Sequence, residues 1–215
     1  MNKNFLTALE RDKENNEDDS LFYSIPRFVY HLDENFRSNL TRLYSENISM
    51  NAVVLDLMSS WVSHLPYHIK YKSVIGHGLN RIELERNKRL DSYWIQDLNL
   101  DRKLPLHDSS INVCLMAAAW QYLQYPEEVA AEIYRVVSPG GQLIVSFSNR
   151  AFWSKTPYIW RNTSDSQHIN YIKNTLLSRG WSKIEVISKV NGTRGIRSLL
   201  SKKSDPFFSV IASKN

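Results

Sequence analysis

Residues 126–149 read PEEVAAEIYRVVSPGGQLIVSFSN, and this stretch decides the fold class. Pro126 followed by two glutamates favours a helix start, because proline tolerates the first helical position and carboxylates interact well with the positive end of the helix dipole. Apolar side chains then recur at helical spacing, and Ser138–Gly141 is predicted to end the helix. The apolar run over 142–148 predicts a buried strand, as in a parallel sheet covered by helices.

The same alternation of strands and helices continues on both sides of this stretch. Further helices are predicted over 80–89 and 166–179, and Asn80 with Glu83 has the spacing of a capping box. The remaining strands are predicted at 52–57, 72–76, 92–96, 111–117, 183–190 and 207–213. The last two are joined by a long basic connection without a clear helix, which favours a hairpin. We therefore predict an α/β fold with a mostly parallel seven-stranded sheet and one antiparallel strand at its C-terminal end.

The chain before the first strand divides into two parts. Residues 10–19, ERDKENNEDD, contain no apolar side chain, so residues 1–20 are predicted to form an acidic, mobile lead-in to a single domain over 21–215. After Pro26, apolar residues recur at helical spacing, at Phe28, Leu32, Phe36, Leu40 and Leu43. This pattern predicts an amphipathic helix over 27–46, which we expect to act as a lid over a pocket.

Composition limits the classes of function. The net charge is +5, and residues 150–215 hold 12 Lys or Arg against 3 Asp or Glu. We interpret this basic third as a solvated face, because its charges are scattered and no nucleic-acid motif accompanies them; RNA binding is the alternative. No apolar run is long enough to span a membrane. The single cysteine, Cys114, lies in an apolar run, and with no signal-peptide pattern it predicts a cytoplasmic protein.

Candidate ligand-binding residues follow the predicted strands, because ligands of open α/β sheets bind beyond the carboxyl ends of the strands. Asp56 ends the first strand, within NAVVLDLMSSWVSHLP (residues 51–66), and Asp97 follows the third. Asn149 and Arg150 follow the fifth strand, and aromatic residues including Trp153 come next. These side chains predict a substrate pocket for a planar or anionic molecule; the alternative is an aromatic cluster that seals the edge of the sheet. No metal site is expected, because Pro66 separates His64 from His68 and no third ligand is evident.

Taken in order, these pieces resemble the class I S-adenosylmethionine-dependent methyltransferases, particularly the small-molecule, type 11-like branch, over roughly residues 21–215. VVLDL (53–57) is similar to the first strand of that family with its terminal acid. WIQDLNLDRKLPLHDSSINVCLMAAAWQYL (94–123) is similar to the third and fourth strands, and PFFSVIASKN (206–215) to the closing antiparallel strand. Residues 126–149 supply the most specific match. The resemblance implies a Rossmann-like fold, S-adenosylmethionine as cofactor, and methyl transfer to a small molecule.

The resemblance also implies roles for individual residues. Asp56 would contact the methionine amino group, and Asp97 would accept from the adenine amino group beside Leu98. The full set of implied cofactor contacts is Asp56, Leu57, Met58, Ser59, Ser60, Asn80, Asp97, Leu98 and Ala117. The candidate substrate contacts are Arg27, His31, Trp120, Asn149, Arg150 and Trp153. No catalytic group is nominated, because methyl transfer depends mainly on positioning and needs a general base only for a protonated acceptor.

Two departures from the family pattern motivate a second hypothesis. The turn after the first strand contains no glycine, and Gly78 stands where the family usually places an acid for the ribose hydroxyls. Asn80 or Glu83 could replace that acid. Trp61 could either cover the cofactor or pack under the first helix. The alternative function is therefore a catalytically inactive scaffold or assembly protein that retains the fold. An NAD-linked enzyme is disfavoured, because the GxGxxG turn is absent.

Overall fold

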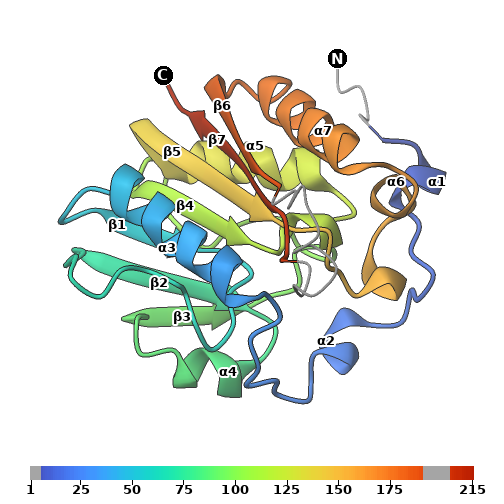
Figure 1. Ribbon diagram of the computed structural model, residues 1–215, viewed down its shortest axis with the longest axis horizontal. Coiled ribbons are helices and arrows are strands. Elements are labelled where there is room, and N and C mark those ends of the chain that lie inside the picture. The colour runs from blue at the N-terminus through green and yellow to red at the C-terminus, as the bar shows by residue number, and fades with distance from the viewer. Residues whose placement is uncertain (1–5, 191–203) are drawn as a thin grey trace, which may run out of the picture.

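Seven strands form one sheet in the computed structural model, which describes residues 6–190 and 204–215 (Figure 1). Their order across the sheet is β3-β2-β1-β4-β5-β7-β6. Neighbouring strands from β3 to β5 pair in parallel, whereas β7 is antiparallel to both β5 and β6. The strands span Val53–Asp56 (β1), Ser73–Gly78 (β2), Ser92–Ile95 (β3), Ile111–Ala117 (β4), Val137–Phe147 (β5), Ser182–Lys189 (β6) and Phe207–Ser213 (β7). The predicted Rossmann-like, mostly parallel sheet with one antiparallel strand is confirmed.

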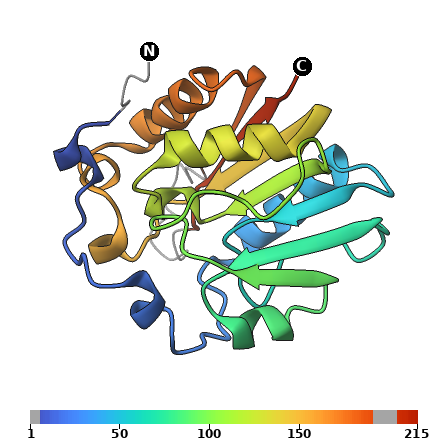
Figure 2. The same cartoon turned by 180° about the vertical axis from the view of Figure 1, so that it is seen from behind.

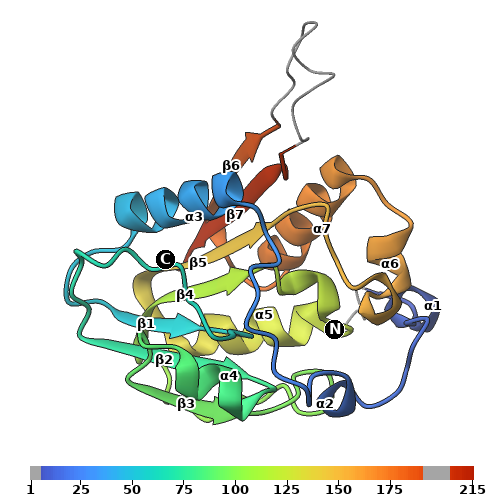
Figure 3. The same cartoon turned by 60° about the horizontal axis from the view of Figure 1, so that its bottom comes forward.

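Helices cover both faces of this sheet. The helix α3 lies on one face, whereas α5 and α7 lie on the other (Figures 1, 2 and 3). The α-helices span Ala8–Arg11 (α1), Asp19–Phe22 (α2), Glu34–Asn47 (α3), Arg81–Arg86 (α4), Pro126–Val136 (α5), Tyr158–Arg161 (α6) and Asp165–Leu177 (α7). Two short 3-10 helices span Trp120–Tyr122 (η1) and Trp153–Lys155 (η2). None of the helices in the described ranges is long and apolar enough to cross a membrane.

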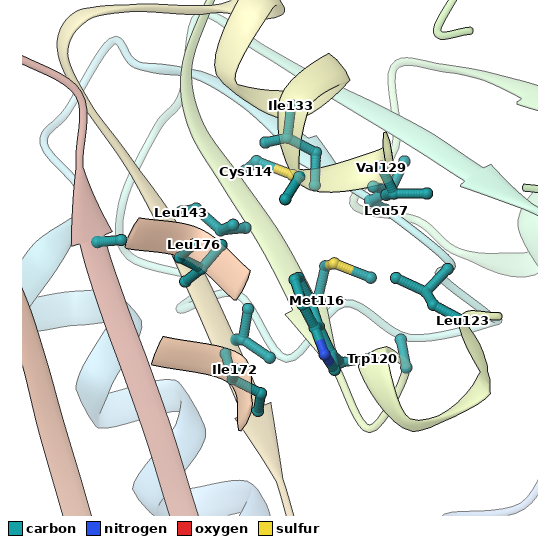
Figure 4. Close-up of a cluster of buried hydrophobic side chains, with 14 of the residues drawn as sticks. Leu57, Cys114, Met116, Trp120, Leu123, Val129, Ile133, Leu143, Ile172 and Leu176 are labelled. Carbon is teal, nitrogen blue, oxygen red and sulfur yellow. The ribbon is translucent and has the colours of Figure 1, made fainter. Parts of the chain in front are cut away.

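The hydrophobic core has two halves because side chains alternate between the faces of a strand. In β4, Cys114 and Met116 point to the half that contains α5 and α7, which Figure 4 shows in close-up. Val113 and Leu115 point to the other half and pack with α3. Both faces of the central strands are therefore apolar, which explains why their sequences read as continuous apolar runs.

The N-terminal amphipathic helix is shorter than predicted. It begins at Glu34, because the Asp33 side chain accepts a hydrogen bond from the Phe36 N–H at 2.8 Å and caps the helix there. Residues 23–33, which we call the strap, join α2 to α3 without helical structure. Phe28 of the strap is 47% exposed and is not part of the buried stripe. The predicted lid helix over 27–46 is therefore corrected: α3 packs on the sheet, and the strap borders the pocket.

Residues 6–20 also differ from the predicted mobile lead-in. They contain α1 and the start of α2, and Arg11 forms a buried ion pair with Glu127 at the start of α5. The Lys13 ammonium lies 2.5 Å from the Asp19 carboxylate, which also pairs with Lys155 at 3.1 Å. These charged residues are ordered by ion pairs with distant parts of the chain, which a reading of local composition does not detect.

The Pro-Gly-Gly segment lies within a strand rather than in a loop. Helix α5 ends at Val136, and β5 runs continuously from Val137 through Ser138–Gly141. Its pairing with β4 shifts register between Ile111 and Val113, and Gly140 has a φ of +78° at this irregularity. Glycine adopts this conformation without steric cost. The basic connection between β6 and β7 falls mostly outside the described residues.

Candidate cofactor and substrate pocket

A cavity of about 480 Å³ lies beyond the carboxyl ends of the parallel strands, a volume in the range of small-molecule binding sites. Residues from the ends of β1, β2, β3 and β4 line it together with the strap. Thirteen sequence-predicted site residues meet in this cavity: Arg27, His31, Asp56, Met58, Ser59, Ser60, Asn80, Asp97, Leu98, Ala117, Asn149, Arg150 and Trp153.

Leu57 and Trp120 are two predicted site residues that do not line the cavity. Both are buried in the core half that contains α5 and α7, where Leu57 is 0% and Trp120 is 1% exposed. Figure 4 shows both side chains among the apolar side chains of that cluster. The predicted substrate contact of Trp120 is therefore replaced by core packing. Leu57 was predicted to contact the cofactor through its backbone, and that contact stays a prediction.

The turn after β1 keeps a tight conformation without glycine. Met58 has a φ of +57°, in the left-handed region that glycine favours. A residue with a side chain, such as Met58, adopts this conformation at a cost of about 1–2 kcal/mol. Its N–H donates to Nδ1 of His77 at 3.1 Å, and the Ser59 N–H donates to the His77 carbonyl at 2.6 Å. The turn is therefore attached to the end of β2 through a single residue.

His77 is a pocket residue that the sequence interpretation missed. Its Nε2–H donates to the Gln96 carbonyl at 2.9 Å while Nδ1 accepts from Met58, so the ring is neutral. Burial lowers the pKa of His77 to about 4, which keeps this arrangement through the physiological range. Its position in the sequence GHG, at the end of the second predicted strand, could have identified His77 as a pocket residue.

Asp56 is a buried carboxylate at the floor of the pocket. It is 4% exposed, and its Oδ2 accepts from the Ser59 hydroxyl at 2.6 Å. Burial raises the pKa of Asp56 to about 6, although hydrogen bonds from Ser59 and Ser63 oppose this rise. The carboxylate is therefore mostly ionised at pH 7. No ion pair of Asp56 occurs within residues 6–190 and 204–215.

Glu83 of α4 is a further acid that lines the pocket. Its Oε1 accepts from the Arg27 backbone N–H at 2.7 Å, and its Oε2 accepts from the Ser60 hydroxyl. Asn80 caps α4 by accepting from the Glu83 N–H, and it donates to the Tyr23 carbonyl at 2.7 Å. The predicted capping box is thus only half formed, because the Glu83 side chain turns to the strap and the turn after β1.

Gly78 has no side chain, which allows the turn after β1 to pack closely against it. Gly78→Ala is therefore expected to weaken cofactor binding. A Cβ atom at Gly78 would lie 2.6 Å from the Ser59 carbonyl oxygen, so the turn would have to move. We expect the affinity for S-adenosylhomocysteine to fall about tenfold or more, with a loss of stability of about 1–3 kcal/mol. Isothermal titration calorimetry and thermal denaturation would measure the two effects.

The matched control is Gly76→Ala in the same strand. Its added Cβ would meet the end of the Leu90 side chain, and Gly76 does not line the pocket. This variant should lose stability but keep its affinity. Equal affinity losses for the two variants would contradict the specific role of Gly78.

One side of the pocket is formed by the segment after β3. Asp97 is half-buried, and burial is the main cause that raises its pKa. Its Oδ1 accepts from the Asn99 N–H at 2.8 Å. The Asn99 amide donates to Asp19 at 3.1 Å, which connects this segment to α2. The N-terminal residues therefore contribute directly to this end of the pocket.

Aromatic side chains line another part of the pocket, beside the strap. The Trp61 Nε1–H donates to the Val29 carbonyl at 3.3 Å, and its ring lies 4.8 Å from that of Tyr30. Trp61 therefore lines the pocket and contacts the strap instead of filling the cavity. The rings of His31 and Phe152 are 5.4 Å apart, edge to face. No cluster of three or more His, Cys, Asp or Glu suited to a metal occurs in the described parts of the chain.

Comparison with known proteins identifies other proteins with this fold. Residues 70–145 match the family model of a methyltransferase domain. No match was found among the curated proteins. Among solved structures, a chain of the Haloferax volcanii complex between the Trm112 methyltransferase activator and its proposed methyltransferase has a TM-score of 0.64 at 12% identity, covering 84% of this chain and 90% of that one.

Two further solved structures have the same fold. An S-adenosylmethionine-dependent methyltransferase of Thermotoga maritima, a candidate histamine N-methyltransferase, has a TM-score of 0.59 at 17% identity, covering 84% of this chain and 90% of that one. Phosphoethanolamine N-methyltransferase 2 of Haemonchus contortus, in complex with S-adenosyl-L-methionine, has a TM-score of 0.58 at 13% identity, covering 84% of this chain and 52% of that one. The chain therefore has the class I methyltransferase fold, and the resemblance to the type 11-like branch is confirmed.

Proposed function

We propose that the pocket binds S-adenosylmethionine and that the protein transfers the methyl group to a small molecule. The observation that carries this proposal is Asp56, an ionised and buried carboxylate without an ion-pair partner in the described residues. A buried charge is costly unless it is paired. The ammonium group of the cofactor is a cation that can pair with Asp56, and the family model match over residues 70–145 supports the same ligand.

The other pocket residues fit the remaining parts of this cofactor. The Glu83 carboxylate borders the position at the end of β2, where a ribose diol needs an acceptor, and Asp97 with Leu98 provides an acceptor and an apolar wall for adenine. Ala117 and Ala118 leave space over β4. The bound cofactor would supply the activated methyl group. The protein would orient cofactor and acceptor and exclude water, for which positioning provides much of the rate.

The scaffold hypothesis rests on the strained turn and on Glu83, whose oxygens already accept two hydrogen bonds from the protein. The cavity argues against a filled pocket, because about 480 Å³ remains open with Trp61 at its wall. The two hypotheses differ in turnover: the enzyme binds the cofactor and transfers its methyl group, whereas the scaffold does not transfer it.

Isothermal titration calorimetry with S-adenosylmethionine and S-adenosylhomocysteine tests the binding step. We expect micromolar dissociation constants for both and much weaker binding of 5′-methylthioadenosine, which lacks the amino-acid group that Asp56 would contact. Absence of heat at high micromolar ligand would overturn the proposed function. Turnover is tested by incubation with methyl-deuterated cofactor and a small-molecule extract, in which mass spectrometry should detect a labelled product. Binding without any labelled product would favour the scaffold.

A further inference from the structure

Apart from Asp19, which pairs with Lys13 and Lys155, the charged side chains of the pocket fall into two groups. Asp56, Glu83 and Asp97 lie at the ends of β1 and β3 and in α4, where the cofactor is proposed to bind. The arginines come from other elements: Arg27 from the strap, Arg37 from α3 and Arg150 from the segment after β5. The cationic groups of the cofactor account for the acids, so we asked which of the arginines lacks a partner within the protein.

Arg37 is the least compensated of these arginines. Its guanidinium lies over the Tyr30 ring, 3.9 Å from the ring centroid. Its Nε is buried without a hydrogen-bond acceptor. No ion pair or side-chain hydrogen bond of Arg37 is present in the two described ranges of the chain. Arg37 as a whole is half-buried and lines the cavity, so a ligand there would meet its terminal nitrogens and not the buried Nε. An anionic group in the cavity would compensate the guanidinium charge through charge-assisted hydrogen bonds.

The other two arginines already have partners. Arg27 donates to the Phe22 carbonyl at 2.9 Å. Arg150 pairs through its Nε with Asp205 at 2.5 Å. Arg37 therefore offers an uncompensated positive charge at the pocket, whereas the charges or donors of Arg27 and Arg150 are at least partly used.

Two neutral side chains lie near Arg37. The Tyr30 ring provides a flat surface below the guanidinium and lies 6.2 Å from the His64 ring. Burial, together with the charge of Arg37, lowers the pKa of His64 to about 4. At pH 7 His64 is therefore neutral and adds a polar ring without a second positive charge.

We propose that Arg37, Tyr30 and His64 form a subsite for the carboxylate of the methyl acceptor, so that the substrates are small carboxylic acids. This inference rests on the proposed function, because it assigns the acidic part of the pocket to the cofactor. The planar fork of a guanidinium matches the two oxygens of a carboxylate, and stacking on a ring leaves its N–H edge available. One uncompensated guanidinium matches a carboxylate, with one negative charge, better than a dianionic phosphate.

The cofactor itself also carries a carboxylate, so the experiment must separate the two sources. The protein is first saturated with S-adenosylhomocysteine, and its thermal denaturation is then measured after addition of an acid or its amide. The two pairs compared are benzoate with benzamide and hexanoate with hexanamide. We expect at least one acid to raise the melting temperature by about 3 °C when its concentration is about ten times its dissociation constant. Its amide should have no effect, because the amide has no charge.

Arg37→Gln should abolish the shift caused by the acid while leaving the dissociation constant of S-adenosylhomocysteine within about twofold. Arg42→Gln is the matched control, because Arg42 lies in the same helix with its side chain 58% exposed. It should behave as the wild type. Arg37→Lys keeps the charge but not the fork, and it should reduce the shift. The ligand-free melting temperature of Arg37→Gln, expected at or above that of the wild type, shows that the variant folds.

Four results would overturn the subsite. These are equal shifts for an acid and its amide, no shift with either acid, a shift that persists in Arg37→Gln, and an Arg37-dependent shift with inorganic phosphate alone. A tenfold loss of S-adenosylhomocysteine affinity in Arg37→Gln, with 5′-methylthioadenosine unaffected, would assign Arg37 to the cofactor carboxylate and also overturn it. If S-adenosylhomocysteine does not bind at all, the proposed function fails. An Arg37-dependent shift caused by an acid in the absence of S-adenosylhomocysteine would still support a carboxylate subsite.

Discussion

Asp56→Asn is expected to stabilise the ligand-free protein at pH 7 and, at the same time, to weaken S-adenosylhomocysteine binding about tenfold to a hundredfold. The stabilisation follows from the pKa of Asp56, which burial raises from its ordinary value of 3.8 to about 6. A rise of about two pKa units corresponds to about 3 kcal/mol against the ionised form in the folded state. Asparagine has a similar shape, carries no charge and can still accept from Ser59.

The raised pKa of Asp56 predicts that its contribution to stability decreases as the pH rises. Below pH 3.8 Asp56 is protonated in both folded and unfolded chains, and no penalty exists. Between pH 3.8 and 6 the unfolded chain ionises first, so the contribution of Asp56 to stability falls as the pH rises. Above pH 6 the full penalty of about 3 kcal/mol is present. The difference in unfolding free energy between Asp56→Asn and the wild type should therefore grow from pH 4 to pH 7.

The loss of affinity follows from the same carboxylate. A hydrogen bond between charged groups contributes about 1.5–3 kcal/mol, which is about tenfold to a hundredfold in affinity. Calorimetry would measure binding, and urea denaturation at several pH values would measure stability. Asp108→Asn is the control, because the Asp108 side chain is 77% exposed and lies outside the pocket. A destabilised Asp56→Asn with unchanged affinity would identify Asp56 as a structural cap of β1 instead.

The parts predicted correctly from the sequence depend on local patterns. Apolar runs bounded by turn residues located the strands, and the ends of these strands placed Asp56, Asp97 and Asn149 at the pocket. In parallel sheets the ends of neighbouring strands meet at one edge, so topology brings together residues that are distant in sequence. Trp120 shows the limit of this reasoning, because it follows β4 in the chain but its side chain is buried in the core.

The parts predicted wrongly depend on long-range contacts. The helical spacing of Phe28 suggested a helix over 27–46, but the Arg27 N–H is held by Glu83, 56 residues away. Residues 10–19 contain too few apolar groups to bury, and local composition predicted a mobile segment. The structure orders this segment through the pair of Arg11 with Glu127, 116 residues apart. Only the folded chain shows these partners.

Arg11→Met should therefore have a large effect on stability, about 3 kcal/mol. The Glu127 side chain is 3% exposed, and loss of its partner would leave an unpaired buried carboxylate. Breaking such a pair typically costs 3–5 kcal/mol, and the position of Glu127 in the first turn of α5 offsets part of this cost. Arg11 also stacks at 4.7 Å on the ring of Tyr125. The long apolar side chain of methionine keeps some of this packing, so the loss reports mainly the charge.

The effect should extend to the pocket, because Arg11 precedes α2 and the strap in the chain. If the ion pair positions this segment, Arg11→Met should increase proteolysis within residues 6–32 and weaken S-adenosylhomocysteine binding. Arg42→Met is the matched control, because the Arg42–Glu46 pair is exposed, with a distance of 3.9 Å; its loss should change stability by about 0.5 kcal/mol or less. The double variant Arg11→Met/Glu127→Met should recover stability by removing the unpaired charge. If Arg11→Met and Arg42→Met unfold at the same urea concentration, the N-terminal segment is not held by this pair.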